Sequence, residues 1–294
     1  MNKHTSFIAA TTATAVCTTG LAATIWSDTH RFVIRRYSVA SHKLKRDTRI
    51  VLLADLHDCV FGRHNKRLLD AIDSIGPDLV ISAGDLITAH HDARAQRGEE
   101  STALLMTLAR RYPLLAANGN HETKLDVARD DYGYGSQYDD YEAMVHAAGG
   151  LVLRNEHFPL RERGIDVAGL ELPLGYFRHF IREPLSRRDM TGYLGEPDAH
   201  AFTILIAHHP DYFDEYCGWG ADLVLSGHIH GGIVRLPFLG GVVSPTCRLF
   251  PEYDGGKYTA GDCTMILSRG LGTHTIPVRL FNPAELVVID LKAV

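Results

Sequence analysis

Short apolar runs that alternate with longer amphipathic stretches constrain the fold of this chain more than any other feature of its sequence. The first five elements predicted in this way are, in order, a strand, a helix, a strand, a helix and a strand. They lie at Arg49–Ala54, His64–Ile75, Asp78–Ala83, Glu99–Arg111 and Pro113–Ala117. This order is typical of a parallel sheet that is flanked by helices. The apolar runs at 51–53 and 79–81 lack polar residues, as expected of strands that are buried on both faces.

Further apolar runs follow in the second half of the chain, where Gly, Pro and turn residues separate them in place of long helices. These runs lie at Ile165–Leu170, Phe202–Ala207, Leu223–Leu225, Thr264–Leu267 and Leu286–Ile289. We expect them to form a second, more antiparallel sheet. Two irregular insertions, Thr123–Tyr141 and Pro173–His200, are candidate lids. No linker interrupts the pattern, so the sequence predicts one domain over residues 47–294.

The composition is that of a globular protein, with 45% hydrophobic and 22% charged residues among 294. Residues 1–49 contain eight Lys and Arg against two Asp, and the rest of the chain is therefore acidic beyond the net charge of −5. An acidic body argues against a general nucleic-acid partner, which would require a basic surface. The five cysteines show no C-x-x-C spacing, so neither a disulfide framework nor a zinc ribbon is indicated.

An uncharged segment near the N-terminus predicts attachment to a membrane. No charged residue occurs from Ser6 to Trp26, and a helix of this length would roughly cross a hydrocarbon core of about 30 Å. We expect residues 1–30 to be a single-pass transmembrane anchor or a signal segment, and 31–46 to be a basic juxtamembrane linker. A hydrophobic helix lying on the body is a further alternative. Basic residues are more numerous after the segment than before it, which favours the cytoplasmic face for the body.

Polar side chains follow each of the first three predicted strands. Asp55 and His57 come after the first strand, where alternation along the strand would send both to one side. Asp85 follows Gly84 at the end of the second strand, and the sequence Gly119-Asn120-His121-Glu122 ends the third. The first motif alone is better explained by a hydrogen-bonded pair, and Asp85 alone is equally well explained as a helix N-cap. Their joint position is informative, because ligands bind outside the carboxyl ends of the strands in open α/β sheets.

Two later strands end in histidines. His208 and His209 follow the run at 202–207, and His228 and His230 follow the run at 223–225. Carboxylate and amide oxygens mixed with imidazoles, without a thiolate, suit Mn, Fe or Zn in a non-structural site. Seven or more ligands exceed the needs of one ion. Two divalent ions bridged by one carboxylate would use them all and would suit in-line attack on phosphorus by a metal-held hydroxide.

The order D-x-H, G-D, G-N-H-E, H-x-P and G-H-x-H resembles the calcineurin-like metallophosphoesterase superfamily from about residue 49 to the end. The continuations Gly231–Pro237 and Ser268–Thr273 are similar to its bacterial membrane-associated phosphodiesterase branch, which includes Bacillus and Escherichia enzymes. The resemblance implies an α/β fold, a four-layer αββα sandwich of two mixed sheets flanked by helices, here with an N-terminal hydrophobic helix.

The resemblance also implies roles for the motif residues. One ion would be bound by Asp55, His57, Asp85 and His230, and the other by Asp85, Asn120, His208 and His228. Asp85 would bridge the two ions, and His121 would act as general acid beside the departing oxygen.

Several neighbouring positions are less defined. Glu122 either orients His121 or is structural, and His209 is the variable residue of H-x-P. Asp58 and Ile233 depart from the residues expected in this branch, and Asp58 adds negative charge near the metals. The insertion at 175–182 is either an amphipathic surface helix or a lid that grips a phosphate while its aromatic residues touch an acyl chain.

We therefore expect hydrolysis of a phosphodiester or pyrophosphate bond in a soluble or lipid-linked substrate. A phosphomonoesterase acting on a protein or metabolite is an alternative, because the same centre could cleave either ester. A metal-binding scaffold without catalysis is a second alternative, although His121 beside a full ligand set argues against it. The sequence does not indicate the natural substrate or the oligomeric state.

Overall fold

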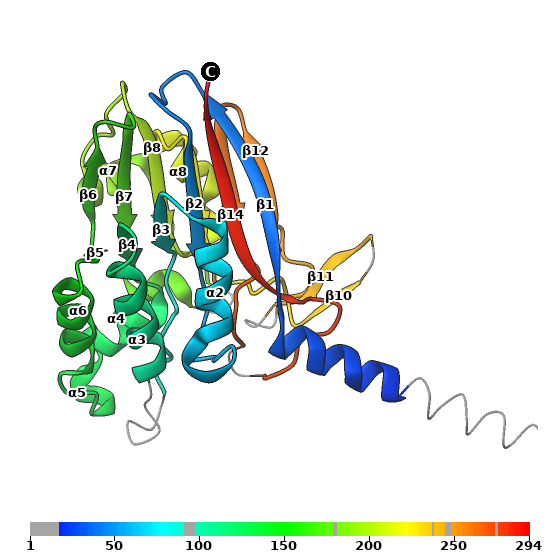
Figure 1. Ribbon diagram of the computed structural model, residues 1–294. Coiled ribbons are helices and arrows are strands. Elements are labelled where there is room, and N and C mark those ends of the chain that lie inside the picture. The colour runs from blue at the N-terminus through cyan, green and yellow to red at the C-terminus, as the bar shows by residue number, and fades with distance from the viewer. Residues whose placement is uncertain (1–17, 91–97, 179–180, 237, 245–247, 274–275) are drawn as a thin grey trace, which may run out of the picture.

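The computed structural model describes residues 18–90, 98–178, 181–236, 238–244, 248–273 and 276–294. Two six-stranded sheets pack face to face, and helices cover the outer face of each sheet (Figure 1). This arrangement confirms the predicted four-layer αββα sandwich.

The first sheet contains the three strands that were predicted from the first half of the sequence. In spatial order its strands are β1 (Phe32–Ser41), β14 (Ala284–Ala293), β2 (Thr48–Leu53), β3 (Leu79–Ser82), β4 (Leu114–Ala117) and β5 (Leu151–Leu153). Strands β2 to β5 are mutually parallel. The last strand, β14, is antiparallel to β2 and parallel to β1. The run at 286–289 therefore belongs to the first sheet and not to the second.

The second sheet is mostly parallel, which corrects the expectation of a more antiparallel sheet. Its spatial order is β12 (Gly256–Ala260), β13 (Cys263–Leu267), β9 (Leu223–Ser226), β8 (Phe202–Ala207), β7 (Ile165–Leu170) and β6 (Glu156–Leu160). The four central strands are parallel, and only the edge strands β6 and β12 are antiparallel to their neighbours. Runs without polar alternation suit such strands, because both faces of a central parallel sheet are buried.

Alternate residues of the central strands face different cores. In β2, Ile50 and Leu52 pack between the two sheets, whereas Val51 and Leu53 pack under the helices of the first sheet. Full burial of an aliphatic side chain of this size stabilises a fold by roughly 1.5–3 kcal/mol. The helices over the first sheet are α2 (Lys66–Ile75), α3 (Glu99–Ala109), α4 (Asn120–Val127), α5 (Arg129–Tyr132) and α6 (Gln137–Ala147). Those over the second are α7 (Arg187–Leu194) and α8 (Phe213–Trp219).

The two insertions are more regular than the sequence predicts. Thr123–Tyr141 runs through α4, α5 and the start of α6, which pack on the sheet. In the second insertion, the short 3₁₀ helix η3 (Leu174–Phe177) is followed by non-helical residues and then by α7. The amphipathic helix predicted as one alternative for 175–182 is therefore wrong for the described residues beyond Phe177. Two further 3₁₀ turns are η1 (Arg63–Asn65) and η4 (Pro210–Tyr212).

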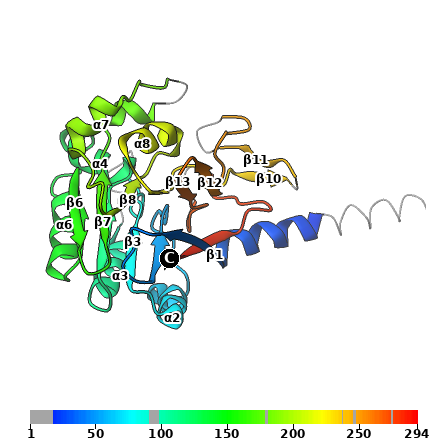
Figure 2. The same cartoon turned by 90° about the horizontal axis from the view of Figure 1, so that it is seen from above.

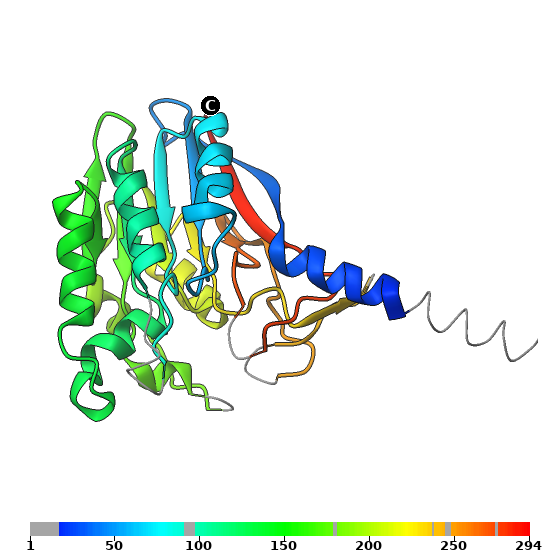
Figure 3. The same cartoon turned by 60° about the horizontal axis from the view of Figure 1, so that its bottom comes forward.

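The segment predicted as a linker, residues 31–46, is part of the folded body. Its residues 32–41 form β1, which pairs with β14 along the whole strand. Residues 18–30 are helical and project from the body next to β1 (Figure 3). Among the described residues, no helix combines the length and the apolar content needed to cross a bilayer. Residues 1–17, which hold most of the predicted apolar segment, lie outside the described residues.

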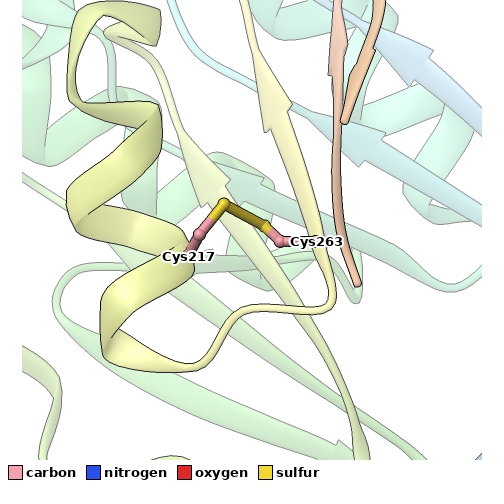
Figure 4. Close-up of a disulfide and its surroundings, with 2 residues drawn as sticks. All are labelled: Cys217 and Cys263. Carbon is pink, nitrogen blue, oxygen red and sulfur yellow. A yellow bond between two sulfur atoms is a disulfide. The ribbon is translucent and has the colours of Figure 1, made fainter. Parts of the chain in front are cut away.

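A disulfide joins α8 to β13, although the cysteine spacing gave no indication of one. Cys217 and Cys263 are 46 residues apart in sequence, with Cα atoms 5.6 Å apart (Figure 4). The packing of α8 over the second sheet brings them together, which residue spacing alone cannot reveal. Cys59 is a free thiol.

Candidate metal centre

The carboxyl ends of the parallel strands in both sheets lie at one edge of the molecule, the lower edge in Figure 1. The loops after β2, β3 and β4 come from the first sheet, and those after β8 and β9 from the second. The motifs that contain the predicted metal ligands lie in these loops or at the first turn of α4. Strand direction therefore positions the site, as predicted.

The side chains converge for a different reason than strand alternation. Strand β2 ends at Leu53, and both Asp55 (φ 50°) and His57 (φ 47°) have left-handed backbone conformations in the loop beyond it. Asp85, His228 and His230 are also left-handed, with φ of 54°, 75° and 54°. Such conformations are costly for residues with a Cβ atom and cluster at functional sites. Tight turns therefore direct these side chains toward one point.

Glycines allow the loops to approach closely at this point. Gly84 has a φ of 90°, and a Cβ atom there would overlap the backbone of Gly119. A Cβ atom on Gly119 would in turn overlap Asp85. Only residues without a side chain permit this contact between the loops after β3 and β4.

The first group of ligand atoms comes from Asp55, His57 and His230, whose donor atoms lie within 4.8 Å of one another. The Nε2 atoms of His57 and His230 are 3.1 Å apart, and His230 Nε2 is 3.5 Å from Asp55 Oδ1. Asp85 Oδ2 lies 3.8 Å from His57 Nε2. These are the four residues predicted to bind the first ion.

The second group comes from Asp85, His208 and His228, again within 4.8 Å. His208 Nε2 is 3.0 Å from Asp85 Oδ2, and its Nδ1 donates to the Ala83 carbonyl at 2.6 Å. Asn120 is next to His121, whose backbone N–H donates to Asp85 Oδ1 at 2.9 Å. Asp85 is therefore adjacent to both groups, as a bridging carboxylate requires.

Buried atoms that can bind a metal, but that make no hydrogen bond, indicate that these residues fit metal ions. Asp55 Oδ2 and Asn120 Oδ1 are buried and make no hydrogen bond in the part of the chain that the structure describes. Buried polar atoms are nearly always satisfied, so two unsatisfied ligand oxygens in one site require an explanation. Oxygen and imidazole ligands suit two divalent cations, which would satisfy both.

The charges at the site also suit bound cations. Burial raises the pKa of Asp55 to about 7. Burial alone would lower the pKa of His208, but the carboxylates of Asp85 and Asp55 raise it to about 9. Burial opposes ionisation of Asp85 too, whereas the imidazoles of His208 and His121 hold its pKa well below the ordinary range. Buried carboxylates of this kind are retained where positive charge compensates them.

Comparison with known proteins identifies the family. The family model described as calcineurin-like phosphoesterase matches residues 48–232. The chain belongs to the calcineurin-like phosphoesterase family. It is a metal-dependent hydrolase, as the sequence predicts.

The relatives extend over most of the chain. The uncharacterized metallophosphoesterase YkuE of Bacillus subtilis is 30% identical over 83% of this chain and 79% of its own length. An uncharacterized metallophosphoesterase of Aquifex aeolicus is 27% identical over 90% of this chain and 94% of its own. Another, from Campylobacter jejuni, is 28% identical over 88% of this chain, which spans 63% of that protein.

In this phosphoesterase, His121 is buried next to the first ion site. Its Nδ1 accepts a hydrogen bond from the Ala89 N–H at 2.9 Å. The proton of the neutral ring therefore lies on Nε2. The His121 ring meets the His57 ring edge to face, with ring centres 5.0 Å apart. A ring nitrogen of His121 lies within 4.8 Å of ligand atoms of His57 and Asp85.

Glu122 joins the loops after β3 and β4 through its hydrogen bonds. Its carboxylate accepts four backbone N–H groups, those of Asp85 (2.8 Å), Leu86 (2.7 Å), Ile87 (3.1 Å) and Gly119 (2.9 Å). Burial and the charge of Asp85 raise its pKa to about 7, although these N–H groups oppose the shift. Of the two roles considered for Glu122, the structural one is favoured, because it fixes the loops that carry Asp85 and Asn120. The motif position was the only available signal.

Asp58 also holds a loop. Its Oδ2 accepts the Thr88 N–H at 3.1 Å, and its Oδ1 accepts the Ser101 hydroxyl at 3.0 Å. These bonds tie the loop after β3 to helix α3. Sequence reasoning considered Asp58 only as added negative charge near the metals, and its hydrogen bonds give it a positioning role.

Arg279 and Asn282 hold the loop that carries His230. The buried Arg279 guanidinium donates to the carbonyls of Arg269 (2.8 Å) and Gly270 (3.2 Å), and also to the Gly272 carbonyl. The Asn282 amide donates to the His230 carbonyl at 2.7 Å. Neither residue belongs to a recognisable motif.

A pocket lies beside the second ion site and shares His228 with it. The 3₁₀ helix η3 contributes Tyr176 and Phe177, and the Phe177 ring lies 5.3 Å from that of His228. His209 lines the pocket, and burial lowers its pKa to about 4, so the ring is neutral. Its Nδ1 accepts the Asp211 N–H at 3.3 Å.

Proposed function

We propose that this chain hydrolyses phosphodiester or pyrophosphate bonds in a lipid-linked substrate. The observation that carries the proposal is the arrangement of two groups of buried ligands on either side of Asp85. The first ion would be held by Asp55, His57, Asp85 and His230. The second would be held by Asp85, Asn120, His208 and His228. Two bound divalent ions would neutralise the phosphoryl group and activate water for attack.

A histidine of the chain faces the departing oxygen in this proposal. The Ala89 N–H occupies Nδ1 of the buried His121, so the proton of the neutral ring lies on Nε2. In this form His121 would donate a hydrogen bond from Nε2 to the oxygen of the leaving group and stabilise the charge that develops there. Transfer of the proton as a general acid would use the imidazolium form, which becomes a neutral ring once Nε2 has lost its proton.

The pocket beside His228 supports a substrate that extends beyond one phosphate. Its lining includes Arg178, Arg182 and Arg248 together with the aromatic rings of η3. Arg182 pairs with Glu215 at 2.9 Å and lies 5.0 Å from the ring centre of Tyr212. Arg248 pairs with Asp211. Arginines beside aromatic rings favour a substrate in which a polar group is joined to an apolar group. A phosphodiester can have both groups, whereas free phosphate has only the polar one.

Comparison of ester classes tests the activity. The full-length chain, supplied with Mn²⁺, is expected to cleave an aryl phosphodiester or a nucleoside-diphosphate lipid faster than an aryl phosphomonoester. His121→Ala should lower turnover by about a hundredfold or more, and His200→Ala, which changes an exposed histidine, serves as its control. Faster monoester cleavage would favour the phosphomonoesterase alternative. No turnover of any of these esters would favour the scaffold.

Membrane attachment through residues 6–26 is part of the proposal, with the body in an oxidising compartment. The Cys217–Cys263 disulfide favours such a compartment, because disulfides rarely persist in the cytosol. Basic residues after the segment predicted the cytoplasmic face instead. However, Arg35, Lys43 and Arg49 pair with carboxylates of the body, so the fold accounts for them without reference to a membrane.

Thiol alkylation in intact cells tests the compartment. In a background in which Cys17, Cys59 and Cys247 are replaced by Ser, Cys217 and Cys263 are expected to react with a maleimide-polyethylene glycol only after denaturation and reduction. Adding Cys217→Ser leaves Cys263 as a single thiol, which should react after denaturation alone and provides the reference. Reaction of both thiols before reduction would contradict the proposed compartment and would favour the cytoplasmic face.

A further inference from the structure

Exposed apolar side chains gather at one side of the phosphoesterase. We call this set the apolar rim. It consists of Leu236, Phe238, Leu239, Leu249, Phe250 and Phe281. The rim includes the hairpin formed by β10 (Val234–Leu236) and β11 (Gly240–Val243). Phe238, in the turn of that hairpin, is fully exposed, and Leu239 and Leu249 are 63% and 68% exposed. Contiguous apolar patches of this kind mark interaction sites.

Backbone contacts join the segments of the rim. A β-bridge connects Val243 to Leu249, and a second connects Val234 to Leu280. The Phe250 N–H also donates to the Val242 carbonyl at 3.0 Å. The rim is therefore one surface built on the hairpin and the two segments that flank it.

The phenylalanines of the rim have an unfavourable backbone conformation. Phe238, Phe250 and Phe281 have φ of 68°, 47° and 54°, in the left-handed region. For a bulky residue this conformation costs roughly 1–2 kcal/mol, which glycine would avoid. Three exposed aromatic side chains kept at such positions contribute little to the core. Backbone strain of this kind clusters at sites of binding and function, which suits a role for the exposed rings themselves.

The helix of residues 18–30 lies on the same side as the rim. Both the helix and the hairpin extend from this side of the body in Figures 1 and 2. The Asn282 N–H donates to Asp28 Oδ2 at 2.9 Å, and the Arg279 N–H donates to Thr29 Oγ1 at 3.3 Å. These bonds connect the helix to the segment that contains Phe281.

The exposed face of this helix has the composition of a membrane interface. Residues 18–23 are exposed and contain no charge. Trp26 is 53% exposed, and the Arg31 guanidinium lies 5.3 Å from the centre of its ring. Arg36 is exposed in β1 and makes no ion pair among the described residues. An exposed tryptophan next to cations is typical of the boundary between lipid head groups and acyl chains.

A small pocket at the metal centre includes apolar residues next to the rim. His230, a predicted metal ligand, lines it together with Ile233, Ile276, Val278 and Arg279. Ile233 directly precedes β10, and Ile276 is 46% exposed. The rim therefore lies next to residues that border the metal centre.

We propose that the apolar rim inserts into the surface of an anionic lipid bilayer and turns the metal centre toward it. This inference rests on the membrane attachment in the proposed function and adds a second contact, made by the body itself. Apolar burial supplies the affinity, and Arg31 and Arg36 lie at the level of the lipid head groups.

Contact quenching by lipids tests the rim directly. Phe238→Trp is introduced into the full-length chain in a Trp26→Phe background, where the remaining Trp219 is buried. The matched control is Val127→Trp in the same background, since Val127 is 62% exposed on α4. Each protein is inserted into phosphatidylethanolamine and phosphatidylglycerol vesicles with brominated or ordinary acyl chains. Brominated lipid is expected to lower emission about twofold at position 238 and to leave position 127 unchanged.

A second reporter keeps the test independent of one variant. Phe281→Trp in the Trp26→Phe background should be quenched in the same vesicles. Adding Leu239→Asp should remove at least about half of that quenching if the rim inserts as one surface. Equal emission in both kinds of vesicle at positions 238 and 281 would overturn the proposal.

Two other outcomes remain distinguishable. Loss of a dimer on Leu239→Asp in sedimentation, without quenching by lipid, would overturn the bilayer as partner and assign the rim to a second copy of the chain. Quenching does not measure turnover, so failure to hydrolyse phosphodiesters would contradict the proposed function and leave the rim unaffected.

Discussion

The two sides of the metal centre are held in place by opposite charges. On the side of the first sheet, the buried Glu122 carboxylate accepts four backbone N–H groups from the loops after β3 and β4. On the other side, the buried Arg279 guanidinium donates to the carbonyls of the loop at 269–272. Both loops turn sharply and leave backbone groups without partners in a helix or strand. A buried ionised side chain satisfies several such groups at once.

The difference has a consequence for the two ion sites. Glu122 fixes the backbone of Asp85 and Gly119, and so the ligands Asp85 and Asn120 of the second site. Arg279 and Asn282 fix the carbonyls of Gly272 and His230, and so a ligand of the first site. The two ions should therefore respond differently when either support is removed.

Substitution of Asp85, the residue predicted to bridge the two ions, should weaken both ion sites and have the largest effect on turnover. Asp85→Asn leaves the shape unchanged but deletes the charge shared by both ions. We expect turnover to fall by about a thousandfold or more, because metal stabilisation is worth several kcal/mol. Metal content per chain, measured by mass spectrometry, should fall for both ions. Retention of two ions and of activity would contradict the bridging role.

Glu122→Gln should weaken the second ion more than the first. The new amide NH₂ would face backbone N–H groups and leave one or two of them unsatisfied, at a cost of about 1–3 kcal/mol each. We expect affinity for the second Mn²⁺ to fall by about 10–100-fold, measured by calorimetry, together with a lower urea midpoint. Glu162→Gln, which changes an exposed carboxylate, is the matched control. An equal loss of Mn²⁺ affinity at both sites would contradict the inference that Glu122 supports mainly the second site.

Arg279→Lys should weaken the first ion, with a smaller effect. An ammonium group replaces the planar fork and cannot reach all the carbonyls that the guanidinium contacts. We expect about a tenfold loss of affinity for one Mn²⁺, while the other binds as in the unchanged chain. Arg161→Lys, at an exposed position, is the control. A change in turnover without any change in metal binding would contradict the supporting role of Arg279 and would indicate that it contacts the phosphate group.

The smallest effect is expected far from the centre, at His157. Its Nδ1 pairs with Asp166 Oδ2 at 2.5 Å, and this hydrogen bond raises the pKa of the imidazole above its ordinary value. The pair therefore stabilises the fold fully below a pH of about 6.5 and loses this contribution as pH rises through the folded pKa. Urea unfolding across this range should show the loss, and His157→Gln should abolish that part of the pH dependence. Metal binding should not change.

Much of the site could be predicted because its residues occupy short motifs after apolar runs. Strand direction predicts that such motifs meet at one edge, whereas the assignment of Asp55, His57 and His230 to one ion came from the family resemblance and agrees with their grouping in the structure. The residues that hold the ligand loops in place were less predictable from the sequence. Arg279 and Asn282 act through backbone carbonyls of segments distant in sequence, and no residue pattern marks such contacts. The disulfide is of the same kind, since α8 and β13 meet only in the folded sandwich.

The sequence by itself determined the layered α/β fold and the chemistry of the metal centre. Apolar runs define buried strands, and the ligand types restrict the ions, so both are local properties. The tertiary structure alone decided the direction of the second sheet, the inclusion of residues 32–41 in the first sheet, and the left-handed turns that aim the ligands. The tertiary structure also brought the residues of the apolar rim together. Each of these depends on pairing between distant segments, which residue order does not encode locally.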